Sequence, residues 1–271
     1  MDISSNSFLQ RYQRIVSLKN SILCVGLDPA LPSQRSKVTM KDDDRLSFMR
    51  NIILDVAPHT SAIKMNRQFL IGLTADEIRS LNILIHQNDM VSIIDHKLSD
   101  IDTSNESAIF WFKEEGFDAF TFSPFGVNIE QASLLAHQKN LGIIVLTILS
   151  NPEAIFYKIA QLEDKPIYLY IAERCKKARV DGFWIGNSEH IDSKDIGRIR
   201  ERIGDNVLAM VPLYGKQHLI VKSAIYHYDS KSMISVSGPI IYSDDVANKA
   251  EEYKLLLNGF RNEMEERRSK Q

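Results

Sequence analysis

Residues 91–101, VSIIDHKLSDI, lead from an apolar run directly into a cluster of charged side chains. Asp95, Lys97 and Asp100 alternate in sign. Successive side chains of a strand point to opposite faces, so we expect Asp95 and Lys97 on one face, His96 on the other and Asp100 on the following loop. Opposite charges in a partly desolvated site stabilise each other's ionised forms. The stretch therefore predicts a charged site at the end of a strand, with His96 in a structural role.

Two further charges stand at the ends of other apolar runs. Asp28 follows the run at 22–27, and Lys64 closes the run at 61–65. A single charge at a strand end is more often solvated, or half of a surface ion pair, than catalytic. Charges at the ends of three successive runs favour a shared site instead.

The runs that carry these charges belong to a longer series. Eight short apolar runs are found at residues 22–27, 61–65, 91–95, 119–122, 142–148, 182–186, 207–211 and 232–237. Segments with helical spacing lie at 43–57, 74–88, 104–115, 129–139, 166–180, 188–203 and 245–266, with a shorter one at 217–228. Runs that are apolar on both faces and alternate with helices indicate an α/β fold with a parallel sheet, and eight strands close a (β/α)8 TIM barrel.

An open doubly wound sheet is the competing architecture. The first run ends in VGLDP, without the G-x-G-x-x-G motif of a dinucleotide-binding sheet. No linker rich in Pro, Gly or Ser divides the chain, so we expect a single barrel domain over residues 1–271. A short N-terminal helix, a helix and loop at 155–166, and a helical C-terminal tail, solvated from about Glu263, complete the expected organisation. Reactive groups of such barrels lie at the carboxyl ends of the strands, which places the charges at one mouth.

The composition narrows the class of partner. Lys and Arg number 33 against 35 Asp and Glu, and the net charge of -2 gives no field that attracts nucleic acid or an acidic membrane. Cys24, Cys175 and the seven histidines show no metal-ligand spacing, so we expect reduced thiols and no metal site. No signal pattern and no apolar run of about 18 residues is present. We therefore expect a cytoplasmic protein that acts on a small molecule.

The charged stretch resembles the signature D-x-K-x-x-D-I-x-x-T of the orotidine 5'-monophosphate decarboxylase family. The matching residues are Asp95, Lys97, Asp100 and Ile101, with Ser104 in place of the threonine. Further similar stretches follow in order: VGLDP, KMNRQF, TFSPFG, LSNP and WIGNSEH. TFSPFG, LSNP and the stretch IRERIGDNVLAMVPLYGKQ resemble the second bacterial type of the family.

The resemblance implies decarboxylation of orotidine 5'-monophosphate to uridine 5'-monophosphate in de novo pyrimidine biosynthesis, without a cofactor. Loss of the carboxylate leaves a carbanion-like centre at C6, which the protein must stabilise electrostatically. By the resemblance, Lys97 donates a proton to C6, Asp95 lies against the departing carboxylate, and Lys64 holds the charged network and a ribose hydroxyl. Asp100, with Ser104, is expected to reach the site of a neighbouring subunit, which implies a homodimer.

The resemblance also assigns residues that bind substrate. The expected set is Asp28, Asn66, Ser104, Ser150, Pro212, Gly215, Gln217 and Gly238. Asp28 would bind ribose, Ser150 the pyrimidine edge, and Gln217 would help to close the site over phosphate and base. From the residues alone, Ser150 reads equally well as a turn residue before Pro152. Leu213 and His218 replace glycines of the loop that carries Gln217.

The most serious departure is Gly238 in SVSGPIIY, where the family has an arginine that contacts the substrate phosphate in a bidentate manner. Residues 239–242 align well, so the register is secure. Backbone N–H groups around Gly238, with Lys216 or Lys222, could hold the phosphate. Alternatively the chain is a weakly active or non-catalytic nucleotide-binding relative. Because the charged residues remain, we expect activity with a raised KM.

A second class of enzyme shares the D-x-K-x-x-D motif. Hexulose-phosphate synthase and ketogulonate-phosphate decarboxylase act on sugar phosphates and need a magnesium ion held by acids at strand ends. The LSNP stretch and the loop with Gln217 favour the pyrimidine substrate.

Overall fold

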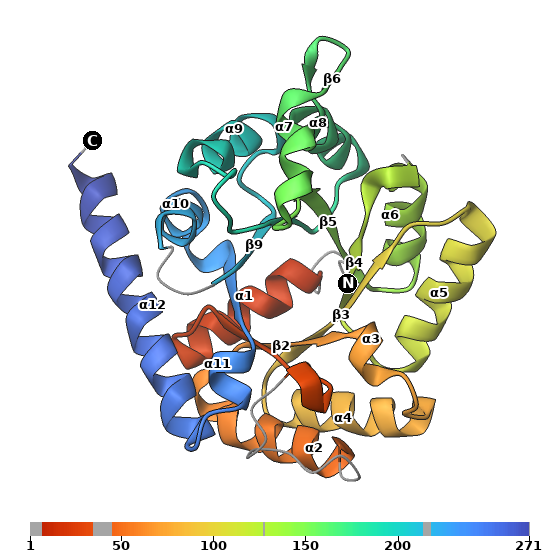
Figure 1. Ribbon diagram of the computed structural model, residues 1–271, viewed down its shortest axis with the longest axis vertical. Coiled ribbons are helices and arrows are strands. Elements are labelled where there is room, and N and C mark those ends of the chain that lie inside the picture. Colours follow the sequence, from red (N-terminus) through yellow and green to blue (C-terminus); the bar gives the residue numbers. More distant parts are fainter. Residues whose placement is uncertain (1–6, 35–44, 127, 214–217, 271) are drawn as a thin grey trace, which may run out of the picture.

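The computed structural model describes residues 7–34, 45–126, 128–213 and 218–270. Its centre is a closed barrel of parallel strands in the order β1-β10-β9-β8-β5-β4-β3-β2 (Figure 1). The strands are β1 (Leu23–Gly26), β2 (Ala62–Asn66), β3 (Val91–Leu98), β4 (Ala119–Phe122), β5 (Gly142–Ile148), β8 (Gly182–Ile185), β9 (Leu208–Pro212) and β10 (Ser232–Val236). The predicted (β/α)8 barrel is confirmed, and the open doubly wound sheet is wrong.

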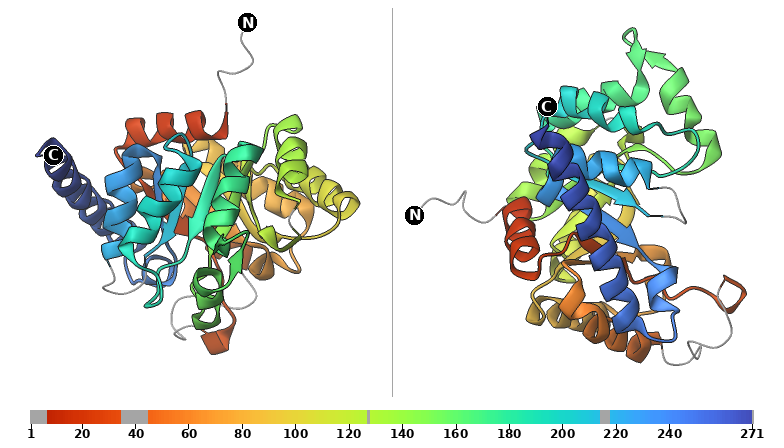
Figure 2. Two further views of the ribbon diagram at one scale, coloured as in Figure 1. Left: turned by 90° about the horizontal axis from the view of Figure 1, so that it is seen from above. Right: turned by 90° about the vertical axis from the view of Figure 1, so that its left-hand side faces the viewer.

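Helices surround the barrel; most of the longer ones cover the outer faces of its strands, and the shortest lie in the connecting loops (Figures 1 and 2). The helices are α1 (Phe8–Lys19), α2 (Arg45–Val56), α3 (Arg67–Leu70), α4 (Ala75–Gln87), α5 (Asp102–Glu114), α6 (Ile129–Gln138), α7 (Phe156–Ile159), α8 (Ile167–Ala178), α9 (Ser193–Ile203), α10 (Leu219–Tyr228), α11 (Gly238–Ile241) and α12 (Val246–Ser269). Since strands such as β5 and β9 are buried along their whole length, both faces are apolar, as a parallel sheet between helices requires.

Helix α1 lies across the end of the barrel where the strands begin (Figure 2). The ring of Phe8 packs so closely on Gly142, at the start of β5, that a Cβ there would lie 2.6 Å from it. The buried Tyr12 donates its hydroxyl to the carbonyl of Ser232, at the start of β10, over 2.7 Å. The interior of the barrel is therefore sealed at this end by α1.

Two peripheral segments differ from the sequence-based expectation. The helix and loop at 155–166 include α7, and also a small antiparallel hairpin of β6 (Gln161–Leu162) and β7 (Lys165–Pro166). The sequence predicts a solvated tail from about Glu263. This prediction is wrong at Met264, which is 2% exposed and packs against the core. Among the described helices, none has the length and hydropathy needed to cross a membrane.

Candidate active site

The structure brings the four charged side chains together at the carboxyl ends of neighbouring strands. The Lys64 ammonium lies 3.5 Å from Asp28 Oδ2 and 3.4 Å from Asp95 Oδ2. The Lys97 ammonium lies 2.8 Å from Asp95 Oδ1. Asp95 therefore stands between two lysines, and Lys64 between two carboxylates.

The parallel register explains why these residues meet. Lys64 of β2 stands beside Gly26 of β1, and Asn66 beside Asp95 of β3. Just beyond β1, Asp28 accepts hydrogen bonds from the Asn66 N–H over 3.1 Å and from the Ser237 hydroxyl over 3.2 Å. The Asp28 carboxylate is thus fixed from both neighbouring strands of the barrel.

Lys97 reaches Asp95 through an irregular stretch of β3. Its φ is +54°, in the left-handed region, and the pairing of β3 with β4 shifts register between Ile94 and Leu98. Thr121 of β4 holds this backbone, because its hydroxyl oxygen accepts from the Lys97 N–H over 2.9 Å and its O–H donates to Asp95 Oδ1 over 2.8 Å. A non-glycine residue at positive φ is strained, so such a bond is needed to keep it there. Sequence reasoning missed Thr121, whose signal was its place in TFSPFG.

His96 points away from this cluster, as expected from its place in the strand. Its ring packs edge-on against Phe112 of α5, with the ring centroids 5.3 Å apart. Burial, and the Arg67 charge, lower the pKa of His96 below its ordinary value. A neutral imidazole against an aromatic ring is a structural contact.

The charges in the cluster stabilise one another. Burial alone would lower the pKa of Lys64, but the carboxylates of Asp28 and Asp95 raise it above the ordinary value. Burial alone would raise the pKa of Asp95, but Lys64 and Lys97, with the Thr121 hydrogen bond, hold it below the ordinary value. Both groups are therefore ionised at neutral pH, and the site presents fixed charges to whatever enters it.

A cavity of about 370 Å³ lies above the charges. Its described lining includes eight residues of the predicted set: Asp28, Lys64, Asn66, Asp95, Lys97, Ser150, Pro212 and Gly238. Sequence reasoning had not assigned the other lining residues, which are Leu149, Asn151, Trp184, Leu213, Ser235, Ser237 and Pro239. A concave site of this size, with apolar walls and a few convergent polar groups, is typical of small-molecule binding.

Four predicted residues are not part of this lining. Asp100 and Ser104 are exposed at the start of α5, where Asp100 Oδ1 accepts the Ile101 N–H over 2.7 Å. Gly215 and Gln217 lie outside the described residues, as does Lys216.

The end of the cavity at Gly238 has little positive charge. Within the described lining the cations are Lys64 and Lys97, and both are paired with acids. Lys222 instead lies between α10 and α12, with its ammonium 2.5 Å from Glu263 and 4.8 Å from the Phe260 ring centroid. The expectation that Lys222 replaces the missing arginine is therefore wrong, because its charge is already committed outside the cavity.

Comparison with known proteins identifies relatives of the chain over most of its length. Orotidine 5'-phosphate decarboxylases of Thermomicrobium roseum and Christiangramia forsetii are 28% and 27% identical, covering 96% and 91% of this chain and 95% and 93% of their own. The crystal structure of a putative orotidine-monophosphate-decarboxylase from Toxoplasma gondii shares the fold, with a TM-score of 0.81, 20% identity and coverage of 95% and 97%. The enzyme from Methanocaldococcus jannaschii complexed with the inhibitor BMP has a TM-score of 0.65, 22% identity and coverage of 87% and 98%. The family model for the orotidine 5'-phosphate decarboxylase / HUMPS family matches residues 21–253, and the chain belongs to that family.

Proposed function

We propose that the protein decarboxylates orotidine 5'-monophosphate to uridine 5'-monophosphate, as a cofactor-free carboxy-lyase of pyrimidine biosynthesis. The observation that carries the proposal is the buried Asp95 carboxylate held between the Lys64 and Lys97 ammonium groups at the floor of the cavity. The names of the curated relatives support the same reaction.

The charged cluster fits the electronic demand of this reaction. Breaking the bond between C6 and the carboxylate releases CO2 and leaves an electron pair on C6. A preorganised ammonium group stabilises that charge without reorganising during the step. Lys97, whose side chain is 44% exposed and lines the cavity, is the proposed donor of the proton that C6 takes up. Lys97 then regains a proton from solvent.

Asp95 and Lys64 have supporting roles in this proposal. Asp95 lies beside the departing carboxylate and, at 2.8 Å from Lys97, keeps that ammonium in place. Lys64 keeps Asp95 ionised and, with Asp28, faces the substrate ribose. The like charges of Asp95 and the substrate carboxylate disfavour the bound substrate relative to the product.

The remaining cavity residues are proposed to bind the rest of the nucleotide. Ser150 contacts the pyrimidine edge, because it lines the cavity together with the charged cluster. Asn66 and Pro212 form walls, and Gly215 and Gln217 are proposed for the loop that closes the site. The phosphate is placed near Gly238, with backbone N–H groups and Lys216 as its proposed partners.

A homodimer with a shared active site is part of the same proposal. Asp100 and Ser104 are exposed and do not line the described cavity of their own chain. Large apolar side chains near the same end of the barrel are also exposed, since Ile101 is 70% and Phe125 82% accessible. A partner subunit that covers them would bring its Asp100 to this site. We also propose that residues 1–271 form one domain and that the protein is cytoplasmic.

The metal-dependent sugar-phosphate reaction of related enzymes fits the geometry less well. Magnesium would need the acids at the strand ends as ligands. Here the Lys64 ammonium lies within 3.5 Å of both Asp28 and Asp95 and already neutralises them. A cation between those carboxylates would have to displace Lys64.

Turnover of orotidine 5'-monophosphate, followed by the loss of pyrimidine absorbance, tests the proposal. We expect turnover that survives a chelator, and a loss of about a thousandfold or more in Lys97→Ala, since the step depends on one proton donor. Lys113→Ala, a change of an exposed lysine on α5, is the matched control. Binding of uridine monophosphate without turnover would identify a non-catalytic relative, and chelator-sensitive turnover of a sugar phosphate would favour the metal-dependent class.

A further inference from the structure

We propose that His190 is a positioning residue that holds Ser150 at the cavity, and that an ion pair between Lys158 and the buried Asp195 anchors it. The inference rests on the proposed function, because it assigns Ser150 to the substrate. It concerns the segment after β8, which the charged cluster does not use.

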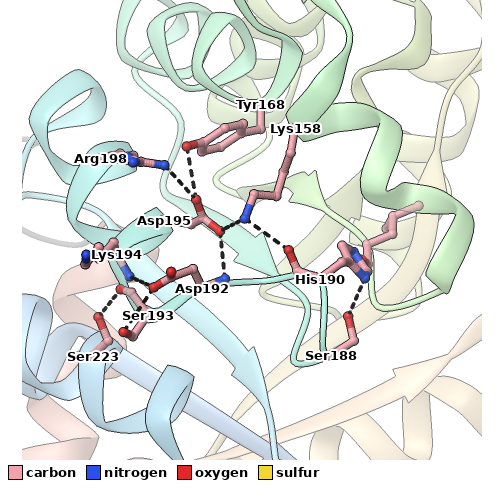
Figure 3. A network of polar contacts seen from close by, with 11 residues as sticks. Lys158, Tyr168, Ser188, His190, Asp192, Ser193, Lys194, Asp195, Arg198 and Ser223 are labelled. Carbon is pink, nitrogen blue, oxygen red and sulfur yellow. Dashed lines mark hydrogen bonds and ion pairs between the residues drawn. The ribbon is translucent and has the colours of Figure 1, made fainter.

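The His190 ring joins two loops, and Figure 3 shows its contact with Ser188. Its Nε2 lies 3.1 Å from the Leu149 carbonyl oxygen, and its Nδ1 lies 3.0 Å from the Ser188 hydroxyl. A carbonyl oxygen can only accept, so Nε2 carries the proton and donates to Leu149. In the neutral ring, Nδ1 then accepts from the Ser188 hydroxyl. The imidazole thus bonds the segment after β8 to the residue that directly precedes Ser150.

A buried carboxylate fixes the backbone that carries His190 (Figure 3). Asp195, in the first turn of α9, is 0% exposed and accepts from Lys158 Nζ over 2.6 Å, from the Tyr168 hydroxyl over 3.1 Å and from the Asp192 N–H over 2.8 Å. Lys158 also donates to the His190 carbonyl over 3.0 Å. A buried carboxylate with several donors has a defined position, because any move would leave a charge uncompensated.

Through these contacts, both ends of the segment from Leu149 to Lys158 are bonded to one residue, His190. The His190 side chain bonds its first residue, and the His190 carbonyl bonds its last. Ser150 and Asn151, which line the cavity, lie between these two points. A segment held at both ends has fewer conformations to lose when a ligand binds.

The side of this segment that faces Gly186 is also closely packed. A Cβ at Gly186 would lie 2.6 Å from Ser150 Oγ and 2.7 Å from its backbone nitrogen, so Ser150 packs directly on the Gly186 backbone. The placement of the Ser150 hydroxyl therefore depends on its backbone neighbours, and His190 supplies the side-chain bond to that backbone. A misplacement of about 1 Å at a substrate contact can cost up to about a hundredfold in rate.

A double-mutant cycle between His190 and Ser150 tests the inference. We expect His190→Ala to lower kcat/KM for orotidine 5'-monophosphate about tenfold, Ser150→Ala to lower it by a similar factor, and the double variant to lose no more than about twofold beyond either. His190→Gln, whose side-chain amide can donate to Leu149, should recover most of the loss. His137→Ala is the matched control, because His137 is bonded to Asp181 at the sealed end of the barrel. It should leave kcat/KM unchanged.

Each outcome decides the inference. Losses that multiply in the double variant, or a His190→Ala protein with full kcat/KM, would overturn the positioning role while leaving the proposed function intact. Absence of turnover in the unsubstituted protein would overturn both. Should His190→Ala fail to fold, Ser188→Ala removes only the partner of Nδ1, and we expect a loss of about threefold that Ser150→Ala again masks. Losses in kcat/KM that multiply when Ser188→Ala and Ser150→Ala are combined would also contradict the inference.

Discussion

Lys64 contacts two carboxylates from a side chain that is only 7% exposed. Removing one partner of a buried ion pair leaves the other charges without compensation, which destabilises more than replacing the whole pair by apolar groups. Without the ammonium, Asp28 and Asp95 would be neighbouring like charges in a partly buried site. The stability of this end of the barrel should therefore depend on Lys64 and on pH.

Lys64→Met should lower the free energy of unfolding by about 3 kcal/mol at pH 7. In the unsubstituted protein the folded-state pKa of Asp95 is lowered, so its ionisation contributes stability above about pH 4, the unfolded-state value, and the contribution is lost as pH falls through the folded-state pKa. In the variant the carboxylates repel, and protonation relieves them. Urea unfolding should show the difference between the two proteins shrinking from pH 7 to pH 4, and an equal difference at both would contradict the argument. The double variant Lys64→Met/Asp95→Asn should regain part of the loss at pH 7.

Gly238→Arg should lower the KM for orotidine 5'-monophosphate about tenfold and change kcat less, because charge-assisted hydrogen bonds to phosphate contribute binding. The side chain has room, since a Cβ at Gly238 would meet Tyr242 at 3.8 Å, an ordinary contact. Gly259→Arg, in open space on α12, is the matched control. Steady-state kinetics decide, and an unchanged KM would show that another group already holds the phosphate.

At the scale of residues, sequence reasoning identified the charged side chains but missed the groups that hold them in place. Asp28, Lys64, Asp95 and Lys97 could be predicted because charges directly after apolar runs are unusual. Thr121 lies in TFSPFG, a stretch noted only for its resemblance, and because threonine is common in strands the stretch does not mark a hydroxyl that bonds two partners. The left-handed backbone of Lys97 likewise has no sequence signal, since lysine rarely adopts it.

At the scale of elements, strand bounds from the apolar runs agree with the structure to about one residue, except for β3, which continues through the charged residues to Leu98. The hairpin of β6 and β7 could not be predicted. Its two-residue strands are not buried and show no alternation. Its turn residues Glu163 and Asp164 both have positive φ, a conformation for which Asn-Gly is the usual sequence signal.

In two pairs of strands, an aspartate carboxylate bonds the end of a helix to the sealed end of the barrel. Asp118, just before β4, accepts from His86 of α4 and from the Ser92 N–H of β3. Asp181, just before β8, accepts from His137 of α6 and from the Ile143 N–H of β5. In each case one carboxylate fixes a strand start and the end of a helix. The hydrogen bond that Asp181 accepts from His137 raises the pKa of His137 above its ordinary value.

The His137 pair should therefore add stability that is lost at alkaline pH. A raised folded-state pKa contributes fully below about pH 6.5, the unfolded-state value, and the contribution disappears as pH rises through the folded-state pKa. Unfolding at pH 5.5 and pH 8.5 should show His137→Gln, which keeps a donor but cannot titrate, falling below the unsubstituted protein at pH 5.5 only. The difference should be about 0.5 kcal/mol or less, because His137 is 43% exposed. A gap of the same size at both pH values would refute this reading.

At the scale of the whole molecule, the two ends of the barrel have separate tasks. Helix α1 seals one end with Phe8 and Tyr12, both buried, and the charged cavity occupies the other. This division is general for the fold, in which the carboxyl ends of the strands carry chemistry and the opposite end carries stability. The barrel could be predicted because eight buried runs admit few closed arrangements. The oligomeric state could not be predicted from the apolar pattern, since the pattern of a single chain does not distinguish a partner's surface from ordinary exposed residues.

The shared site gives the whole molecule its sharpest test. Asp100 is proposed to act in the partner's cavity and Lys97 in its own, so each single variant, Lys97→Ala or Asp100→Ala, should be nearly inactive as a homodimer. In a mixed dimer, one cavity lacks both groups, whereas the other combines Lys97 of the Asp100→Ala chain with Asp100 of the Lys97→Ala chain and is complete. Random exchange of equal amounts makes half of the dimers mixed, so activity should return to about one quarter of the unsubstituted value. Co-expression of the two variants with distinct tags allows the mixed dimer to be purified, and its single complete cavity of two should then give about one half of the unsubstituted activity. Activity that stays at the level of the single variants would place both residues in the same cavity and remove the reason for a shared site.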